Sequence, residues 1–151
     1  MTAQQLSIFL ENQPGRLAEV MDVLARAEIN IRALSLADTS EFGVLRLLAD
    51  KPEAARAALR EQGFRAQITE VAAVEVPDRP GALSRVLNAF HAAGVDVEYM
   101  YAFVGRPREG AIMIFRLSDP EKAARALTPD LGRLVPTAEI QGFALDPGPA
   151  G

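Results

Sequence analysis

The sequence predicts an α+β fold made of two tandem copies of one strand–helix–strand–strand–helix–strand unit. The turn Asn-Gln-Pro-Gly-Arg-Leu at residues 12–17 returns as Asp-Arg-Pro-Gly-Ala-Leu at residues 78–83, a shift of 66 positions (78 − 12 = 66). The hydrophobic positions after each turn keep this register, and Asp-Lys-Pro-Glu at residues 50–53 returns as Ser-Asp-Pro-Glu at residues 118–121. One folding unit is therefore encoded twice.

The first unit opens with an apolar strand at residues 6–10 that must turn abruptly into a helix. Asn12 offers a turn or capping oxygen, proline stiffens the corner, and Gly15 leaves the first helical turn without a Cβ. The following helix runs to about Ala27, because apolar side chains fall at i, i+3, i+4 and i+7, namely Leu17, Val20, Met21 and Leu24.

The rest of the first unit alternates strands with a second helix. Ile-Asn-Ile at residues 29–31 opens the second strand, and a polar hairpin at residues 38–43 leads into a third strand at residues 44–49. A helix with an N-cap and an early proline, Pro52, then runs to near Gly63. The fourth strand is expected at residues 64–68.

The second unit repeats this order with one longer loop. We expect a strand at residues 74–76, a helix from Leu83 to Ala93, a second strand that opens at residues 95–97, and after a hairpin turn a third strand at residues 111–117. The next proline lies 68 positions after its counterpart (120 − 52 = 68), so the hairpin loop at residues 105–110 is two residues longer. A helix from Pro120 and a strand at residues 133–135 complete the unit.

Each half therefore predicts the ferredoxin-like βαββαβ arrangement, an antiparallel sheet with both helices on one face. The expected domains are residues 1–70 and 71–143, with residues 144–151 as a disordered tail. Because no flexible linker separates the halves, we expect them to pack side by side as one rigid body.

The composition excludes several classes of function. The formal net charge of −4 gives no electrostatic case for binding nucleic acid, and no apolar run is long enough to span a membrane. The absence of cysteine removes thiol catalysis and thiolate metal sites, and the N-terminus does not resemble a signal peptide. We therefore expect a cytoplasmic protein with no metal and no cofactor.

The two Pro-Gly turns are the strongest candidates for a binding site. First-turn N–H groups of a helix have no intrahelical partner and carry the positive end of the helix dipole, so a carboxylate can dock there. The same turns also suit a purely structural corner in which glycine permits close packing.

Together these features resemble a known family, the tandem ACT domains that sense amino acids. The resemblance rests on the (Asn/Asp)-x-Pro-Gly-x-Leu turn in both halves, on the strand start at residues 29–31, and on Val-Glu-Tyr-Met-Tyr-Ala-Phe at residues 97–103. It covers roughly residues 5 to 143. It implies modules paired side by side into a continuous sheet, with the ligand bound between the turn of one module and the second strand of its neighbour.

The sequence and the resemblance together give a set of candidate ligand-binding residues. Asn30 and Asp96 are either ordinary residues at the start of a strand or contacts for a ligand ammonium group. Tyr99 and Tyr101 point the same way on a strand and are either core aromatics or part of a pocket. The full set is Asn12, Gln13, Pro14, Gly15, Arg16, Leu17, Asn30, Ile31, Asp78, Arg79, Pro80, Gly81, Ala82, Leu83, Asp96, Val97, Tyr99 and Tyr101.

These observations favour a non-enzymatic regulatory protein that binds a free amino acid, assembles as a homo-oligomer such as a dimer, and acts on a metabolic enzyme or transporter. A second hypothesis is an interaction subunit of an amino-acid biosynthetic enzyme, since the strands at residues 44–48 and 112–117 are apolar on both faces. A weaker one is an acylphosphatase-like hydrolase using Arg16 or Arg79 with Asn30. The single histidine, His91, is expected on a helix surface.

Overall fold

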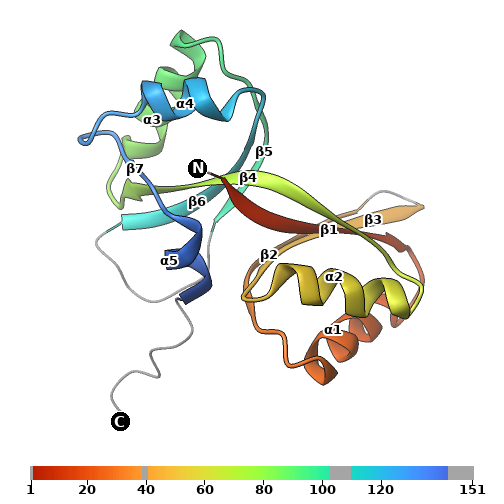
Figure 1. Cartoon of the computed structure of the whole chain (residues 1–151). Helices are drawn as coiled ribbons and strands as arrows, with labels where there is room; N and C mark the ends of the chain where they lie inside the picture. The colour runs from red at the N-terminus through yellow and green to blue at the C-terminus, as the bar shows by residue number, and fades with distance from the viewer. Residues whose placement is uncertain (1, 39–40, 103–109, 143–151) are drawn as a thin grey trace. The chain divides into compact units, whose positions relative to one another are not determined.

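The structure, a computed structural model, describes residues 2–38, 41–102 and 110–142 (Figure 1). It divides into two compact units: an N-terminal unit of Gln4–Thr69, with which residues 141–142 group, and a C-terminal unit of Glu70–Ile140, to which residues 2–3 also belong. The elements in chain order are β1 (Ala3–Glu11), α1 (Arg16–Arg26), β2 (Ile31–Asp38), β3 (Phe42–Ala49), α2 (Pro52–Glu61), β4 (Arg65–Pro77), α3 (Ala82–Ala92), β5 (Val97–Ala102), β6 (Gly110–Leu117), α4 (Pro120–Ala126), β7 (Arg133–Leu134) and α5 (Thr137–Gly142).

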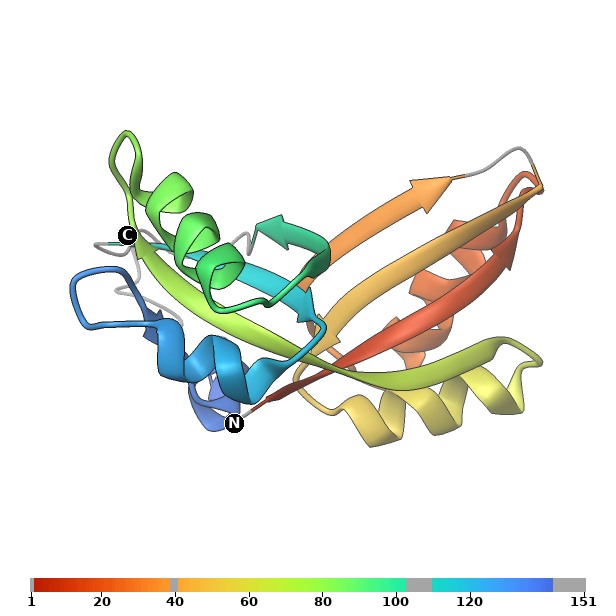
Figure 2. The same ribbon diagram turned by 90° about the horizontal axis from the view of Figure 1, so that it is seen from above.

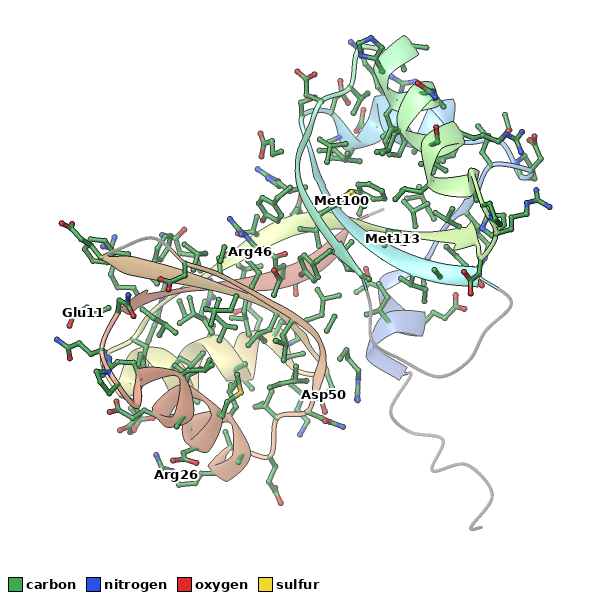
Figure 3. All side chains as sticks on the ribbon, turned by 180° about the vertical axis from the view of Figure 1, so that it is seen from behind. Glu11, Arg26, Arg46, Asp50, Met100 and Met113 are labelled. Atoms are coloured by element: carbon green, nitrogen blue, oxygen red, sulfur yellow. The ribbon has the colours of Figure 1, made fainter. Side chains whose placement is uncertain are left out.

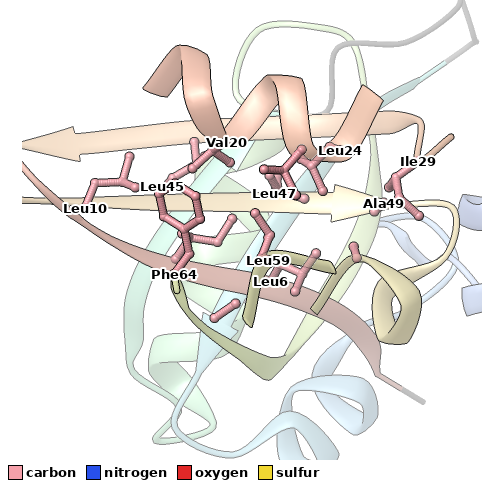
Figure 4. Packing of buried hydrophobic residues seen from close by; sticks show 14 residues of the cluster. Leu6, Leu10, Val20, Leu24, Ile29, Leu45, Leu47, Ala49, Leu59 and Phe64 are labelled. Atoms are coloured by element: carbon pink, nitrogen blue, oxygen red, sulfur yellow. The ribbon is translucent and has the colours of Figure 1, made fainter. Parts of the chain in front are cut away.

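In the N-terminal unit the strand order is β2-β3-β1-β4, with β3 antiparallel to both of its neighbours and α1 and α2 on one face of the sheet (Figures 1 and 2). Period-two alternation turns every second residue of β1 and β3 toward the helices. The resulting core joins Leu6, Leu45 and Leu47 to Val20 and Leu24 of α1 and to Leu59 of α2 (Figure 4). Each of these side chains is at most 1% exposed.

In the C-terminal unit the order is β7-β4-β6-β5, and α3 and α4 lie on one face of the sheet (Figure 2). The pair Val74 and Met113 points toward these helices, whereas the next pair, Glu75 and Ile112, points to the opposite face, which we call the reverse face. Phe90 and Phe115 meet edge to face beneath the helices, with ring centroids 5.5 Å apart.

The predicted βαββαβ order is thus confirmed in both units, with three differences. The strands expected at residues 64–68 and 74–76 form one continuous strand, β4. The last strand, β7, has only two residues, and the short helix α5 after it was not predicted. The loop at residues 105–110, apart from Gly110, and the tail at residues 144–151 lie outside the described residues.

Candidate ligand site

The turn between β1 and α1 leaves the start of the helix open. Gly15 is the N-cap residue with φ 84°, in the left-handed region, and a Cβ built on it would meet nothing within 4 Å. The amide of Asn12 donates to the carbonyl of Glu41 at 3.1 Å and fixes the chain just before the turn. Among the described residues, no side chain caps α1. The amide of Arg16 donates to the carbonyl of Gln13 at 3.3 Å, and the following amides of the first turn of α1 are available to a ligand anion.

The turn before α3 repeats this backbone. Gly81 is the N-cap with φ 84°, the space beside it is equally open, and the described chain provides no capping side chain. The amide of Ala82 donates to the carbonyl of Arg79 at 3.2 Å, which closes the turn. Asn12 and Asp78 were expected to supply a turn or a capping oxygen. Of these two roles capping is excluded, because a glycine occupies the N-cap position in both turns.

The side chains make the two turns unequal. Arg16 Nη1 donates to Glu19 Oε2 at 2.8 Å, and its guanidinium carbon lies 4.6 Å from the centre of the Phe64 ring. The charge of Arg16 is thus directed along its own helix. At turn two this position is Ala82, which is buried, while the nearby Arg79 is exposed.

Asn30 and Asp96 hold the start of the second strand of each unit through their backbones. The amide of Asn30 donates to Asp50 Oδ1 at 3.0 Å and its carbonyl accepts from the amide of Asp50 at 3.1 Å. The amide of Asp96 donates to Ser118 Oγ at 2.9 Å in the same way. Both side chains remain exposed.

Within one unit, the turn and the start of the second strand are far apart. The eleven residues of α1 separate Asn12 from Asn30, a helix length of about 16 Å. In Figure 3, Glu11, which precedes Asn12, and Asp50, which binds the amide of Asn30, lie at opposite ends of the N-terminal unit. The structure therefore does not bring turn and strand start together within a unit, and Arg16 and Asn30 cannot form the acylphosphatase-like pair there.

Tyr99 and Tyr101 share the reverse face of the C-terminal sheet. Tyr99 pairs with Arg116 and Tyr101 pairs with Ile114, whereas Met100 packs against the core on the other face (Figure 3). Their common direction was predicted. The remaining candidates divide into the exposed Gln13, Pro14, Leu17, Asp78 and Pro80, and the half-buried Ile31, Leu83 and Val97, which pack against the two cores.

A hollow that the sequence did not predict lies in the N-terminal unit. It has a volume of about 190 Å³ and is lined by Glu19, Asp22, Val23, Arg26, Gln62 and Phe64. None of the predicted ligand residues lines it. In the described part of the chain, no three His, Cys, Asp or Glu side chains gather as a metal site requires, and none of the helices there is both long and apolar enough to cross a membrane.

Comparisons with known proteins agree with this architecture. Residues 1–135 match the model of the ACT domain pair. The chain is similar to protein BT0572 from Bacteroides thetaiotaomicron, with 40% identity and a TM-score of 0.86 over 93% of this chain and 96% of that one. No curated protein matches the sequence.

Two regulatory subunits of aspartate kinase share the fold at lower identity. The ligand-free Thermus thermophilus subunit has 21% identity and a TM-score of 0.58, over 83% of this chain and 89% of that chain. The Thermus flavus subunit has 20% identity and a TM-score of 0.54, over 82% and 88%. With two βαββαβ units, two glycine-capped turns and a family match over most of its length, the chain belongs to the ACT domain pair family.

Proposed function

We propose that the protein is a non-enzymatic regulator that binds a free amino acid at the start of α1, within proposed domains of residues 1–70 and 71–143. The observation that carries the proposal is the open helix start, where Gly15 has φ 84° and a Cβ added there would meet nothing within 4 Å beyond its neighbours along the chain. A ligand carboxylate at this position gains the first-turn N–H groups and the helix dipole together.

The opposite end of the ligand needs acceptors. We propose that its ammonium group meets backbone carbonyls and a carboxylate or amide at the start of a second strand, such as Asp96 or Asn30, contributed by another ACT module. Tyr99 and Tyr101 would then select the side chain by shape. For about ten heavy atoms at roughly 0.5 to 0.8 kcal/mol each, binding of about 5 to 8 kcal/mol gives micromolar affinity.

Turn one is the better carboxylate site. Asn12 is neutral there, whereas Asp78 at turn two places a negative charge beside an incoming carboxylate unless Arg79 offsets it. Arg16 attracts a carboxylate at turn one only weakly, because Glu19 accepts a hydrogen bond from its guanidinium at 2.8 Å. The difference between the turns is therefore the repulsion from Asp78.

Calorimetry on two matched variants tests the assignment, after a thermal-shift screen of the twenty amino acids has identified the ligand. We expect Asn12→Asp to weaken binding by about 1 kcal/mol or more and Asp78→Asn to change it little. The reverse order of effects would make turn two the principal site. If no amino acid shifts the melting temperature, the sensor function itself is wrong.

A second candidate function, an interaction subunit, is supported by leucines on the edge strand β2. Leu34 and Leu36 are 49% and 46% exposed, and β2 ends the strand order of its unit. We propose that this edge pairs two copies of the chain, and that the dimer acts on a metabolic enzyme or transporter.

Sedimentation velocity tests whether the edge strand β2 forms the dimer. Leu36→Lys should convert a dimer into a monomer by placing a charge on the edge, whereas Glu53→Lys on the exposed side of α2 should leave the dimer intact. A dimer that persists in Leu36→Lys would move the association surface elsewhere, and a stable complex with an enzyme in native extracts would favour the interaction subunit over the sensor.

A further inference from the structure

The short helix α5 occupies a place that has no counterpart in the N-terminal unit. It follows β7 and lies on the reverse face of the C-terminal sheet, opposite α3 and α4 (Figures 1 and 2). The stretch that matches the family model ends at residue 135, just before α5 begins at Thr137. The helix is therefore an addition to the βαββαβ unit that carries it.

Charged and polar contacts hold α5 in place. Arg133 on β7 donates to both oxygens of Glu139 on α5, at 3.1 and 3.2 Å, and its Nη2 also donates to Glu75 on β4. These two carboxylates, Glu139 foremost, raise the pKa of Arg133 further above its usual range. At the start of α5, Thr137 Oγ1 donates to the carbonyl of Thr2 at 2.6 Å.

The surface beside α5 is apolar and buried. On the reverse face Glu75 pairs with Ile112 and Ala73 pairs with Ile114, and Arg133 ties α5 to Glu75 on this face. Ile112 is 5% exposed and Ile114 is 0% exposed, although neither belongs to the core beneath α3 and α4. From α5 itself, Ile140 is buried to 2% exposure and supplies an apolar anchor.

The helical structure of α5 does not by itself hold it in place. A helix of six residues is not stable by itself in water, where about 12 to 15 residues are marginal. The strand before it, β7, is short: Leu134 and Arg133 pair with β4, and the amide of Val135 donates to the carbonyl of Ala73 at 2.8 Å. Ion pairs between partly exposed groups weaken as salt shortens the screening length from about 10 Å at 0.1 M to about 3 Å at 1 M.

We propose that α5 is a releasable strap: it covers the reverse face of the C-terminal sheet, is held there by Arg133 between Glu75 and Glu139, and leaves before the unit unfolds. Release uncovers the isoleucines of β6 and so switches an apolar surface between closed and open. The occupant of this face in the closed state is α5 itself.

Hydrogen exchange of the full chain, read by mass spectrometry, tests the strap. The amides of α5 should exchange about two- to fivefold faster in 1 M than in 0.1 M salt, while those of α3 keep their rate. Glu139→Gln should show the faster rate already at low salt and lose the salt dependence. Binding of an apolar-surface dye should rise in the same variant.

Two further variants make the outcome decisive. Glu75→Gln removes the carboxylate on the sheet and should loosen α5 as Glu139→Gln does, whereas Glu121→Gln, on the exposed first turn of α4, should change nothing. Protection of α3 in each variant shows that the unit is still folded. The proposal is overturned if α5 exchanges only together with α3, or if Glu139→Gln and salt leave its rate unchanged while Ile140→Ala raises it.

Discussion

At the scale of single residues, the left-handed glycines decide where the helices begin. Gly15 and Gly81 share φ 84°, a conformation in which a side chain approaches the neighbouring carbonyl oxygen. The open space beside them means that this backbone strain, rather than a steric clash with the surroundings, is what a substitution would introduce.

We expect Gly15→Ala to lower the free energy of unfolding by about 1 to 2 kcal/mol, because alanine is strained at positive φ. Gly43→Ala is the matched control: it lies in β3, and its Cβ would meet Leu36 at an ordinary 3.6 Å. Urea denaturation of both variants measures the difference. Equal losses would show that the conformation of Gly15 is not what constrains it.

The same turns show which residue roles could be predicted from the sequence. The repeated Pro-Gly pair correctly located both helix starts, since it lies between a strand pattern and a helical stripe. Of the two roles expected for Asn12 and Asp78, a turn or a capping oxygen, capping is excluded, because a polar residue before a helix is a cap only if it occupies the N-cap position. In both turns that position belongs to glycine.

At the scale of elements, the second helices of the two units begin differently. The N-cap of α4 is Asp119, whose Oδ1 accepts from the amide of Lys122 at 3.1 Å. The N-cap of α2 is Lys51, which has no acceptor to offer, and the preceding Asp50 binds the amide of Asn30 instead. An aspartate side chain thus caps α4, whereas α2 begins at Pro52 without a side-chain cap.

Asp119→Ala should therefore destabilise the C-terminal unit by about 1 kcal/mol, since it leaves a first-turn amide of α4 without its partner. Lys51→Ala at the equivalent position should change stability by less than about 0.5 kcal/mol. Hydrogen exchange at α4 and α2 would localise the two effects. A larger loss in Lys51→Ala would imply that its bond to the Glu28 carbonyl matters more than the cap.

Element order was predictable, whereas the end of the chain was not. Eleven of the twelve elements belong to the repeated pattern, including β7, which the repeat placed at residues 133–135, but α5 has no counterpart. A six-residue helix is too short to show a period, and Arg133, Glu139 and Glu75 are brought together only by the fold. The sequence therefore did not predict α5 or the ion pairs that hold it.

At the scale of the whole molecule, two hydrophobic cores stabilise the chain separately. Leu47 belongs to the core of the N-terminal unit and Phe115 to that of the C-terminal unit, and both are 0% exposed. Truncating either creates a cavity, which costs about 2 to 5 kcal/mol for leucine and about 3 to 5 kcal/mol for phenylalanine.

We expect the losses in Leu47→Ala and Phe115→Ala to add within about 0.5 kcal/mol in the double variant, because the two side chains share no cluster. Phe90→Ala with Phe115→Ala is the contrast, since these rings touch and should show a coupling energy of about 0.5 to 1.5 kcal/mol. Guanidinium denaturation of the singles and doubles measures both cycles. Strong coupling between Leu47 and Phe115 would contradict two independent cores.

The continuous strand β4 also constrains how the duplicated gene can change length. Its even-numbered residues supply both cores, Ala66 and Ile68 in the first and Ala72, Val74 and Val76 in the second. A codon gained or lost near Thr69 would reverse this alternation and turn Glu75 toward the second core, unless a bulge absorbed the extra residue. At this joint, insertions and deletions of two residues preserve the alternation, whereas those of one do not.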